Sequence, residues 1–331
     1  MIELQLRHHD LARIRFASSP IWEVMGSLRA LADRSRYQAH YPWIRAIQPH
    51  LREIGEVDLG LLVALASGRE YVLDFVTPPP TVARRSFAEE LEQVRGTPSD
   101  IVRAELDHLC GGGQLPLPLR ALYEDPAGQL GRAAGVLARY WQVAVAPVWP
   151  RLLALADADL ARRAHHLIVG GVIQLLNDLH PSVHYDTDEL HVSKCTDVSR
   201  RALHGSGIVL VPCAFVWPGT LLLADPPYQP TLAYTPGGVA WLWRGNGAAP
   251  QSPLGPLLGQ RRAMLLCQLE LPWTTTALAG RLEMSPGTVS QHLKILKNAG
   301  LVTARRTGRA VLYQRTPLAT RLLEAHLAAH D

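Results

Sequence analysis

A short stretch rich in turn-forming residues, Gly245 to Pro253, constrains the fold of this 331-residue chain more than any other feature. It combines Gly, Asn, Pro and Ser and contains no large apolar side chain. Such a segment has nothing to bury in a core, which is typical of a linker between domains. We therefore expect an N-terminal body at 1–244, a linker at 245–255 and a C-terminal domain at 256–331, with a separate core in the body and in the domain.

Charge is divided unevenly between these regions. The formal net charge of the whole chain is +4. From residue 255 onward there are ten Lys and Arg but four Asp and Glu, whereas the rest of the chain has 23 basic and 25 acidic residues. A compact basic domain attached to a nearly neutral body indicates a polyanionic partner, although solvated basic residues alone would give the same count.

The pattern of the body predicts an α+β fold, helical over 1–180 and strand-rich over 181–244. A short extended segment at Ile2–Leu6 comes first. Ser19-Pro20 then supplies a helix cap followed by proline at the first helical position, and helical spacing recurs to about residue 179. Beyond that point the spacing shortens to that of strands between turns.

One uncharged stretch, Gly207–Ala224, has the length of a membrane span. Because Pro212 and Pro218-Gly219 interrupt it, we interpret it as two buried strands and expect no membrane association. The N-terminus lacks the apolar core of a signal peptide. The four cysteines lie far apart, with no paired spacing, as expected for reduced thiols in a cytoplasmic protein.

The C-terminal domain predicts a regular order of elements. Helical segments at 256–269 and 277–282 precede a turn and a third helix, Ser285–Asn298, capped by serine and ending before a glycine. Two short strands, 301–304 and 310–313, then form a hairpin that has arginines at its tip, before a last helix. This order is a winged helix-turn-helix, so the chain as a whole is expected to be mainly α with a smaller β portion.

The helix Ser285–Asn298 has two different sides. Its apolar residues Val289, Leu293 and Leu296 recur at helical spacing on one face. Gln291 and Lys294 fall on the opposite face, among other small or polar residues. Glutamine can pair with adenine in the major groove of DNA and lysine can reach phosphate or guanine, so this pattern favours DNA recognition.

The motifs of this domain closely resemble those of the ArsR family of bacterial transcription regulators. The body has a weaker resemblance, at Val209–Val216, Asp225-Pro226-Pro227 and Gln229–Leu232, to the N-terminal extension that precedes such a domain in actinobacterial regulators. The family motifs, which cover about a quarter of the chain, are Thr276–Leu282, Ser285–Leu296, Ala299–Val302, Gly308-Arg309 and Leu312-Tyr313.

The resemblance implies a homodimer that binds double-stranded DNA with inverted half-sites, through a recognition helix in the major groove and a basic wing. It implies dimerisation through the first and last helices of the domain, about 256–270 and 317–329. The implied DNA-binding residues are Ser285, Thr288, Ser290, Gln291, His292, Lys294, Arg305, Arg306 and Arg309. Of these, His292 can also be explained as a structural residue.

The sequence departs from the family pattern in the short helix. Ala277 replaces a glutamate that is common there, so no capping box forms with the preceding threonine. The family's metal sensors carry paired cysteines in this helix, whereas Thr274–Leu282 has no cysteine, histidine or acid. Ligation of a soft metal at this site is therefore excluded.

The body offers two weaker sets of candidate residues. Aromatic side chains often line pockets for small molecules, and Trp22, Trp141 and Trp217 are the candidates for an effector pocket, although they suit a core equally well. The donors between His180 and His191 could converge on a cation, but they also suit a helix end and an ordinary edge strand. We assign no metal site and no cofactor.

No catalytic motif is present: GxSxG, GxxxxGK[ST], HExxH and a GxGxxG after a strand are all missing. We therefore expect a DNA-binding transcription regulator, not an enzyme, with a body that senses a small organic molecule or a partner. The alternative is a small-molecule-binding or enzymatic body whose winged domain serves only for dimerisation or protein contact.

Overall fold

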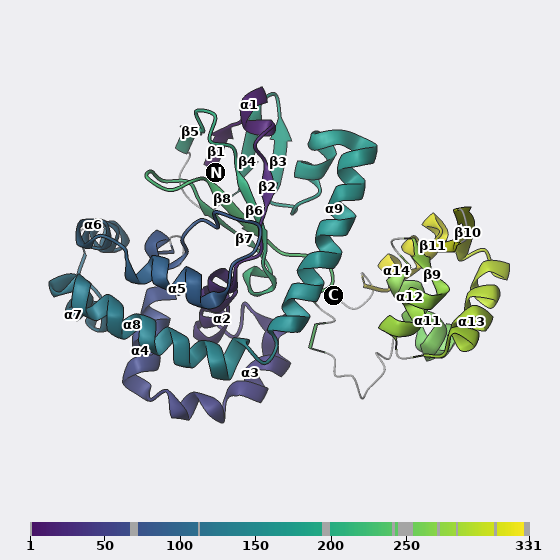
Figure 1. Cartoon of the computed structure of the whole chain (residues 1–331), viewed down its shortest axis with the longest axis horizontal. Helices are drawn as coiled ribbons and strands as arrows, with labels where there is room; N and C mark the ends of the chain where they lie inside the picture. Colours follow the sequence, from purple (N-terminus) through teal and green to yellow (C-terminus); the bar gives the residue numbers. More distant parts are fainter. Residues whose placement is uncertain are drawn as a thin grey trace. The chain divides into compact units, whose positions relative to one another are not determined.

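The computed structural model forms two compact units, Met1–Trp243 and Arg244–Asp331 (Figure 1). Helices make up 57% of it and strands 15%, which confirms the predicted mainly α fold with a smaller β portion. Most of the expected linker, 245–255, lies outside the described residues. The residues described are 2–66, 72–111, 113–193, 199–239, 242–243, 254–269, 272–282, 284–307 and 310–327.

The helices of the first unit follow the predicted spacing. In α2 the Oγ of Ser19 accepts from the backbone N–H of Trp22 at 3.4 Å, and proline occupies the first turn, as predicted. Figure 1 shows α4, α5, α7 and α8 grouped on one side of this unit and the strands on the other. The helices are α1 (His8–Leu11), α2 (Pro20–Ala32), α3 (Tyr41–Ile47), α4 (Glu56–Ala66), α5 (Phe87–Arg95), α6 (Ser99–Cys110), α7 (Leu117–Glu124) and α8 (Pro126–Tyr140).

A longer helix, α9 (Trp149–Asn177), follows α8 and packs against the strands. It begins at Trp149, with proline in its first turn. Gly171 interrupts it with φ 71° and ψ −170°, a conformation that only glycine adopts readily, so the helix kinks there. Between α8 and α9 the segment Trp141–Val145 forms a π-helical turn, η4.

Two four-stranded sheets complete this unit, in the orders β3-β4-β1-β5 and β2-β6-β8-β7. The strand expected at the N-terminus is present as β1, and six of the eight strands in the described part of this unit follow residue 180, where the sequence pattern predicted a strand-rich region, although β2 precedes α2. β1 lies between β4 and β5 and pairs with both, whereas β2 pairs with β6 at the edge of the other sheet, so both sheets combine an early strand with later ones. The strands are β1 (Ile2–Gln5), β2 (Arg15–Phe16), β3 (Val183–Asp186), β4 (Glu189–Val192), β5 (Ser199–Ala202), β6 (Val209–Pro212), β7 (Thr220–Leu223) and β8 (Thr231–Tyr234).

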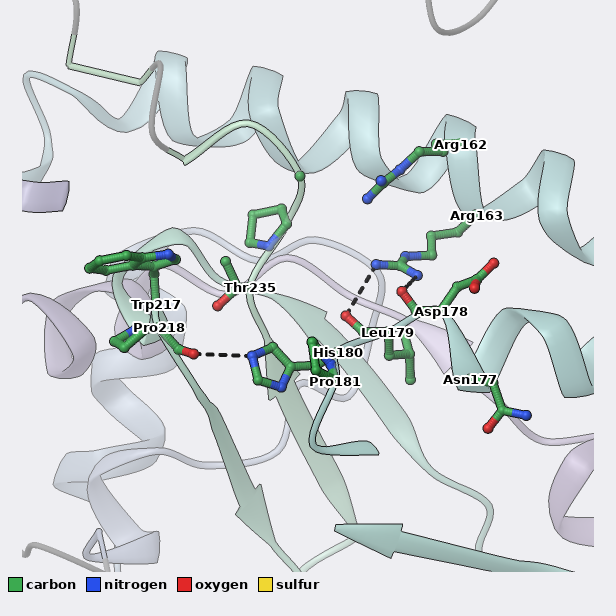
Figure 2. Close-up of a pocket in the computed structure, with 12 residues that line it drawn as sticks. Arg162, Arg163, Asn177, Asp178, Leu179, His180, Pro181, Trp217, Pro218 and Thr235 are labelled. Carbon is green, nitrogen blue, oxygen red and sulfur yellow. Dashed lines mark hydrogen bonds between the residues drawn. The ribbon is translucent and has the colours of Figure 1, made fainter. Parts of the chain in front are cut away.

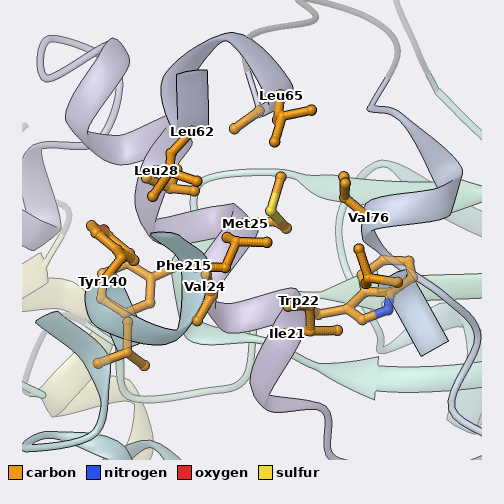
Figure 3. Packing of buried hydrophobic residues seen from close by; sticks show 14 of the residues in the cluster. Ile21, Trp22, Val24, Met25, Leu28, Leu62, Leu65, Val76, Tyr140 and Phe215 are labelled. Atoms are coloured by element: carbon orange, nitrogen blue, oxygen red, sulfur yellow. The ribbon is translucent and has the colours of Figure 1, made fainter. Parts of the chain in front are cut away.

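The uncharged stretch 207–224 forms β6, a short 3-10 turn η5 (Ala214–Val216) and β7, as its prolines predicted. Among the helices in the described ranges, none has both the length and the apolar character needed to cross a bilayer. The helical core, shown in Figure 3, closes around η5. A Cβ added to Gly26 of α2 would lie 2.9 Å from Cβ of Phe215, so glycine permits this close approach.

The second unit has the predicted order of a winged helix-turn-helix around its own core. The expected helix 256–269 is divided in two, because Gly259 has φ +82° and ends the first turn. The elements are α10 (Gly255–Leu258), α11 (Gln260–Gln268), β9 (Trp273–Thr274), α12 (Thr275–Arg281), α13 (Pro286–Asn298), β10 (Val302–Thr307), β11 (Ala310–Arg315) and α14 (Pro317–Leu327).

Candidate DNA-binding surface

The start of α13 is fixed by its cap. The Oγ of Ser285 accepts from the backbone N–H of Thr288 at 3.2 Å and lies 2.8 Å from the Oγ1 of the same residue. Pro286 occupies the first helical position, where its missing N–H is not needed. Ser285 is exposed, so the capped N-terminus of the helix, with its remaining free N–H groups, faces solvent.

The apolar face of α13 contributes to the core of the second unit. Val289, Leu293 and Leu296 are at most 1% exposed and pack against α11 and α12. Ser290, Gln291 and Lys294 are exposed, and within the described residues their side chains make no hydrogen bond or ion pair. The fold therefore uses one face of the helix and leaves the polar residues of the other available for a partner.

Two of the predicted contact residues, Thr288 and His292, are half-buried at the edge of this face. Burial lowers the pKa of His292, and the nearby Arg262 and Arg261 of α11 lower that pKa further. Its Nδ1 is buried, with no hydrogen-bond partner in the described residues. His292 is thus an uncharged ring beside two guanidinium groups near pH 7, and its contact with DNA stays a prediction.

The end of α13 leads directly into the wing. Gly300 has φ +69°, and the N–H of Leu301 donates to the carbonyl of Leu296 at 2.9 Å, which is the pattern of a glycine-ended helix. The backbone N–H of Thr316 donates to Leu301 at 3.0 Å and that of Arg315 donates to Leu269 at 2.7 Å. These bonds fix the hairpin to both α11 and the end of α13.

The wing hairpin is longer than the sequence suggested. β10 and β11 pair from Val302↔Arg315 to Thr307↔Ala310, so only positions 308 and 309 separate the strands. Arg305 and Arg306 therefore lie within β10 on opposite faces of the strand, not at the tip, and both are exposed. Arg309 lies outside the described residues.

The predicted set omitted one exposed cation of α13, Lys297, which lies one turn beyond Lys294. Its charge and spacing were visible in the sequence. Elsewhere in the second unit, the thiol of Cys267 is half-buried, and burial raises its pKa, with a smaller opposing effect from Arg315. Cys267 is therefore a neutral thiol packed inside the domain, which is not the state that binds metal.

The structure does not place the three candidate tryptophans of the body around one cavity. Trp22 is 1% exposed on the inward face of α2, and its Nε1 donates to the carbonyl of Pro78 at 3.1 Å. Trp141 stacks on Phe87, with ring centroids 4.6 Å apart. Of the three, only Trp217 lines the cavity in Figure 2. Trp22 therefore packs in the core, and the assignment of an effector pocket to these tryptophans stays a prediction.

The donors between His180 and His191 spread along β3, β4 and the turn before them. Both ring nitrogens of His180 have partners, Ser182 and the carbonyl of Pro218. His184 and His191 are paired across the two strands, and His191 lies 3.8 Å from the Oε1 of Glu3. In the described ranges, no three His, Cys, Asp or Glu side chains converge as metal ligands would.

Comparison with known proteins identifies the second unit. Residues 260–304 match the model of bacterial regulatory proteins of the arsR family. The HTH-type transcriptional repressor SmtB of Mycobacterium tuberculosis, in strains CDC 1551 and H37Rv, is 51% identical to this chain over 51 residues. The match covers 15% of this chain and 33% of the relative, so the chain spans one third of the length of these curated relatives.

No solved structure matches the chain. The family match covers α11, α12, α13 and the first residues of β10, which are the elements that build the exposed polar face. Residues 260–304 are therefore a helix-turn-helix domain of the arsR family of bacterial regulatory proteins.

Proposed function

We propose that this protein is a sequence-specific DNA-binding transcription regulator, in which α13 enters the major groove and the β10–β11 hairpin contacts the flanking backbone. One observation carries the proposal: the apolar face of α13 is buried while Ser290, Gln291 and Lys294 are exposed and unused by the fold. A helix with this exposed polar face fits the width of the major groove.

The roles of the side chains follow from their chemistry. The amide of Gln291 can pair with the exposed edge of an adenine, and Lys294 can reach guanine or phosphate. Arg305 and Arg306 of the wing supply sequence-independent contacts to the DNA backbone. The exposed N-terminus of α13, capped by Ser285, adds backbone N–H groups for a phosphate.

We further propose that the regulator is a homodimer that binds inverted half-sites. Leu257 of α10 is 72% exposed and Leu318 of α14 is 52% exposed, in the first and last helices of the unit. A second copy that covered these side chains would remove apolar surface from water. Two recognition helices related by two-fold symmetry would read two half-sites about one helical turn apart. The N-terminal body would then act as the sensor of a small organic molecule.

The test is a binding selection from a random duplex pool, followed by titration of the selected duplex. We expect a symmetric site, and we expect Gln291→Ala with Lys294→Ala to weaken binding at least tenfold. Arg45→Ala changes an exposed cation of the body and serves as the control. Equal binding by the double variant and the wild type would contradict the assignment of the reading face.

The salt dependence separates this function from the alternative, in which the winged domain only contacts protein. A DNA-binding surface with several phosphate contacts loses affinity steeply as salt rises, in proportion to the number of contacts. A domain used only for protein contact would show no affinity for duplex DNA even at low salt.

A further inference from the structure

A cavity of about 470 Å³ opens on the N-terminal unit beside α9. It lies between α9, the turn that follows this helix, and the segments 217–218 and 235–237 (Figure 2). A volume of this size is in the range of pockets for small organic molecules. The indole of Trp217 and three prolines give it apolar walls, and two arginines of α9 give it polar ones.

Most polar groups around the cavity hold the wall together. The Nδ1 of His180 accepts from Ser182, so its Nε2–H donates to the carbonyl of Pro218, at 3.1 Å. The side chain of Asn177 bonds both backbone groups of Tyr185. These bonds join the end of α9 to β3 and to the Trp217-Pro218 segment, so the cavity is formed before any ligand arrives.

Behind the two arginines lies one buried carboxylate, Asp159, which pairs with both guanidinium groups. Arg162 and Arg163 both bond it, and it also accepts from the hydroxyl of Tyr234 at 2.7 Å and the N–H of Gly237 at 3.1 Å. The side chain of Arg163 is 2% exposed, whereas that of Arg162 is 23% exposed. Arg162 is therefore the guanidinium that solvent, and hence a ligand, can reach.

A second acid, Asp178, also lines the cavity, and its side chain is 41% exposed. Its Oδ2 lies 2.9 Å from the Nδ1 of His166. Figure 2 shows Arg162, Thr235, Trp217 and Asp178 among the residues that line the cavity. An anion that approaches the opening would thus meet a guanidinium and a planar apolar ring. Arginine binds carboxylates through two parallel hydrogen bonds and indole binds flat apolar groups.

Trp217 also connects the cavity to the point where the chain leaves this unit. Its ring is edge-on to His40, with centroids 6.2 Å apart, and His40 is edge-on to Trp243 at 5.7 Å. The indole Nε1–H of Trp243 donates to the Nδ1 of His40 at 2.9 Å. His40 is fully buried, and Trp243 is the last residue of the first unit.

We propose that this cavity binds a small organic carboxylate with a planar apolar ring, held by Arg162 and Trp217, and that the contacts Trp217–His40–Trp243 link its occupancy to the segment leading to the DNA-binding unit. A ligand that moves the indole of Trp217 changes the packing around His40, and with it the position of Trp243. Only the second half of this inference depends on the proposed function.

The binding site is tested by calorimetric titration of the full chain with 2-naphthoate, and with 2-naphthamide as the uncharged analogue. We expect saturable binding of the carboxylate and at least tenfold weaker binding of the amide. Arg162→Gln should weaken 2-naphthoate binding at least tenfold, while Asp159 keeps Arg163 as its partner. Arg151→Gln, at an exposed position of the same helix, is the control and should leave the affinity unchanged.

A second variant displaces the guanidinium of Arg162 without removing its charge. A Cβ at Gly237 would lie 2.9 Å from the Nη2 of Arg162, so Gly237→Ala should displace the guanidinium and weaken binding as well. The proposed site is wrong if 2-naphthoate does not bind at millimolar concentration, or binds Arg162→Gln as tightly as the wild type.

The link to the second unit is tested in the presence of the selected DNA. We expect 2-naphthoate to change the DNA affinity of the wild type at least threefold. Trp243→Phe keeps a ring but loses the hydrogen bond to His40, so it should bind 2-naphthoate normally and lose this change. A wild type that binds 2-naphthoate and DNA independently would overturn the link. Failure of the wild type to bind any duplex would instead overturn the proposed function, and the calorimetric test of the cavity would still stand.

Discussion

The exposed face of α13 and the wall of the cavity beside α9 both collect polar side chains, but the fold uses them differently. On α13, Gln291 and Lys294 contribute nothing to the internal hydrogen bonding of the described chain. Around the cavity, His180, Asn177 and Arg163 are all bonded to the protein itself. A surface of the first kind can contact a large partner through many groups, whereas the cavity offers a fixed shape and the partly exposed guanidinium of Arg162.

This difference predicts where substitutions damage the fold. A polar group that holds a buried network leaves its partners unsatisfied when it is removed, and the cost is several kcal/mol. A polar group on an open face leaves nothing unsatisfied, and its removal is nearly neutral.

The largest effect is expected for Asp159→Asn in the body. It leaves two guanidinium groups near a site that no longer carries a negative charge, so the free energy of unfolding should fall by about 3–5 kcal/mol. Asp157→Asn, whose carboxylate is 42% exposed and pairs with Arg84, should cost at most about 1 kcal/mol. Seven of the eight tryptophans are in the body, so denaturation followed by tryptophan fluorescence reports on it. Equal losses in the two variants would remove the distinction between the two kinds of polar surface.

The next effect concerns the two faces of α13. Leu293 is 0% exposed, so Leu293→Ala opens a void in the core and should destabilise the second unit by about 2–4 kcal/mol. Gln291→Ala, two residues earlier, should change stability by less than about 0.5 kcal/mol. Hydrogen exchange of peptides that cover 286–298 in the full chain measures both. If Gln291→Ala also speeds hydrogen exchange strongly, this glutamine stabilises the fold, and its assignment as a residue available to contact DNA is wrong.

The third prediction concerns the pH dependence of stability that the buried Glu90 causes. Glu90 is 1% exposed and accepts from the N–H of Ile21 at 2.9 Å, and burial raises its pKa to about 7. A raised pKa in the fold means that the contribution of Glu90 to stability is complete below about pH 4.5 and is lost as the pH rises through 7. The free energy of unfolding of Glu90→Gln, relative to that of the wild type, should therefore be about 2–3 kcal/mol higher at pH 8 than at pH 5, since each pKa unit is worth about 1.4 kcal/mol.

The titration of His40 changes stability in the opposite direction with pH. Burial lowers its pKa to about 4, so its contribution is complete above pH 6.5 and is lost as the pH falls toward 4. Glu90→Gln removes a contribution that opposes that of His40, so its stability should fall more steeply than that of the wild type as the pH decreases from 6.5 toward 4.5. The control Glu92→Gln changes a side chain that is 64% exposed. A difference between Glu90→Gln and the wild type that does not vary with pH would contradict the assigned shift.

The sequence predicted local structure well wherever a cap or a repeat spacing was present. Ser19-Pro20 and Ser285-Pro286 begin helices at the expected residues, and Val289, Leu293 and Leu296 are buried together because helical spacing alone places them on one face. The exposed polar face of α13 follows from the same spacing, so most of the candidate DNA-binding surface was visible in the sequence.

Long-range pairing was not predictable in this way. Nothing in Ile2–Gln5 indicates that it lies between strands formed some 190 residues later, because strand partners are chosen by the whole sheet. The cavity was missed for the same reason. Asp159 and Arg162 are neighbours on one turn of α9, but the contacts that Tyr234 and Gly237 make with Asp159 cross the fold, and no motif in the sequence marks those contacts.

The smallest effect on stability is expected at Ser285, which both caps a helix and is predicted to contact DNA. Its Oγ caps α13 and is also a predicted DNA contact, so it belongs both to the fold and to the reading face. Ser285→Ala should cost about 1 kcal/mol in the stability of the first turn of α13, whereas Ser290→Ala should stay within about 0.5 kcal/mol. Hydrogen exchange at the start of α13 separates the variants.

Ser285→Asp keeps a capping oxygen and should restore stability, but it places a negative charge beside the DNA phosphates and should weaken binding below that of Ser285→Ala. If stability and DNA affinity instead rise together in Ser285→Asp, this terminus does not face DNA, and the reading face must begin further along the helix.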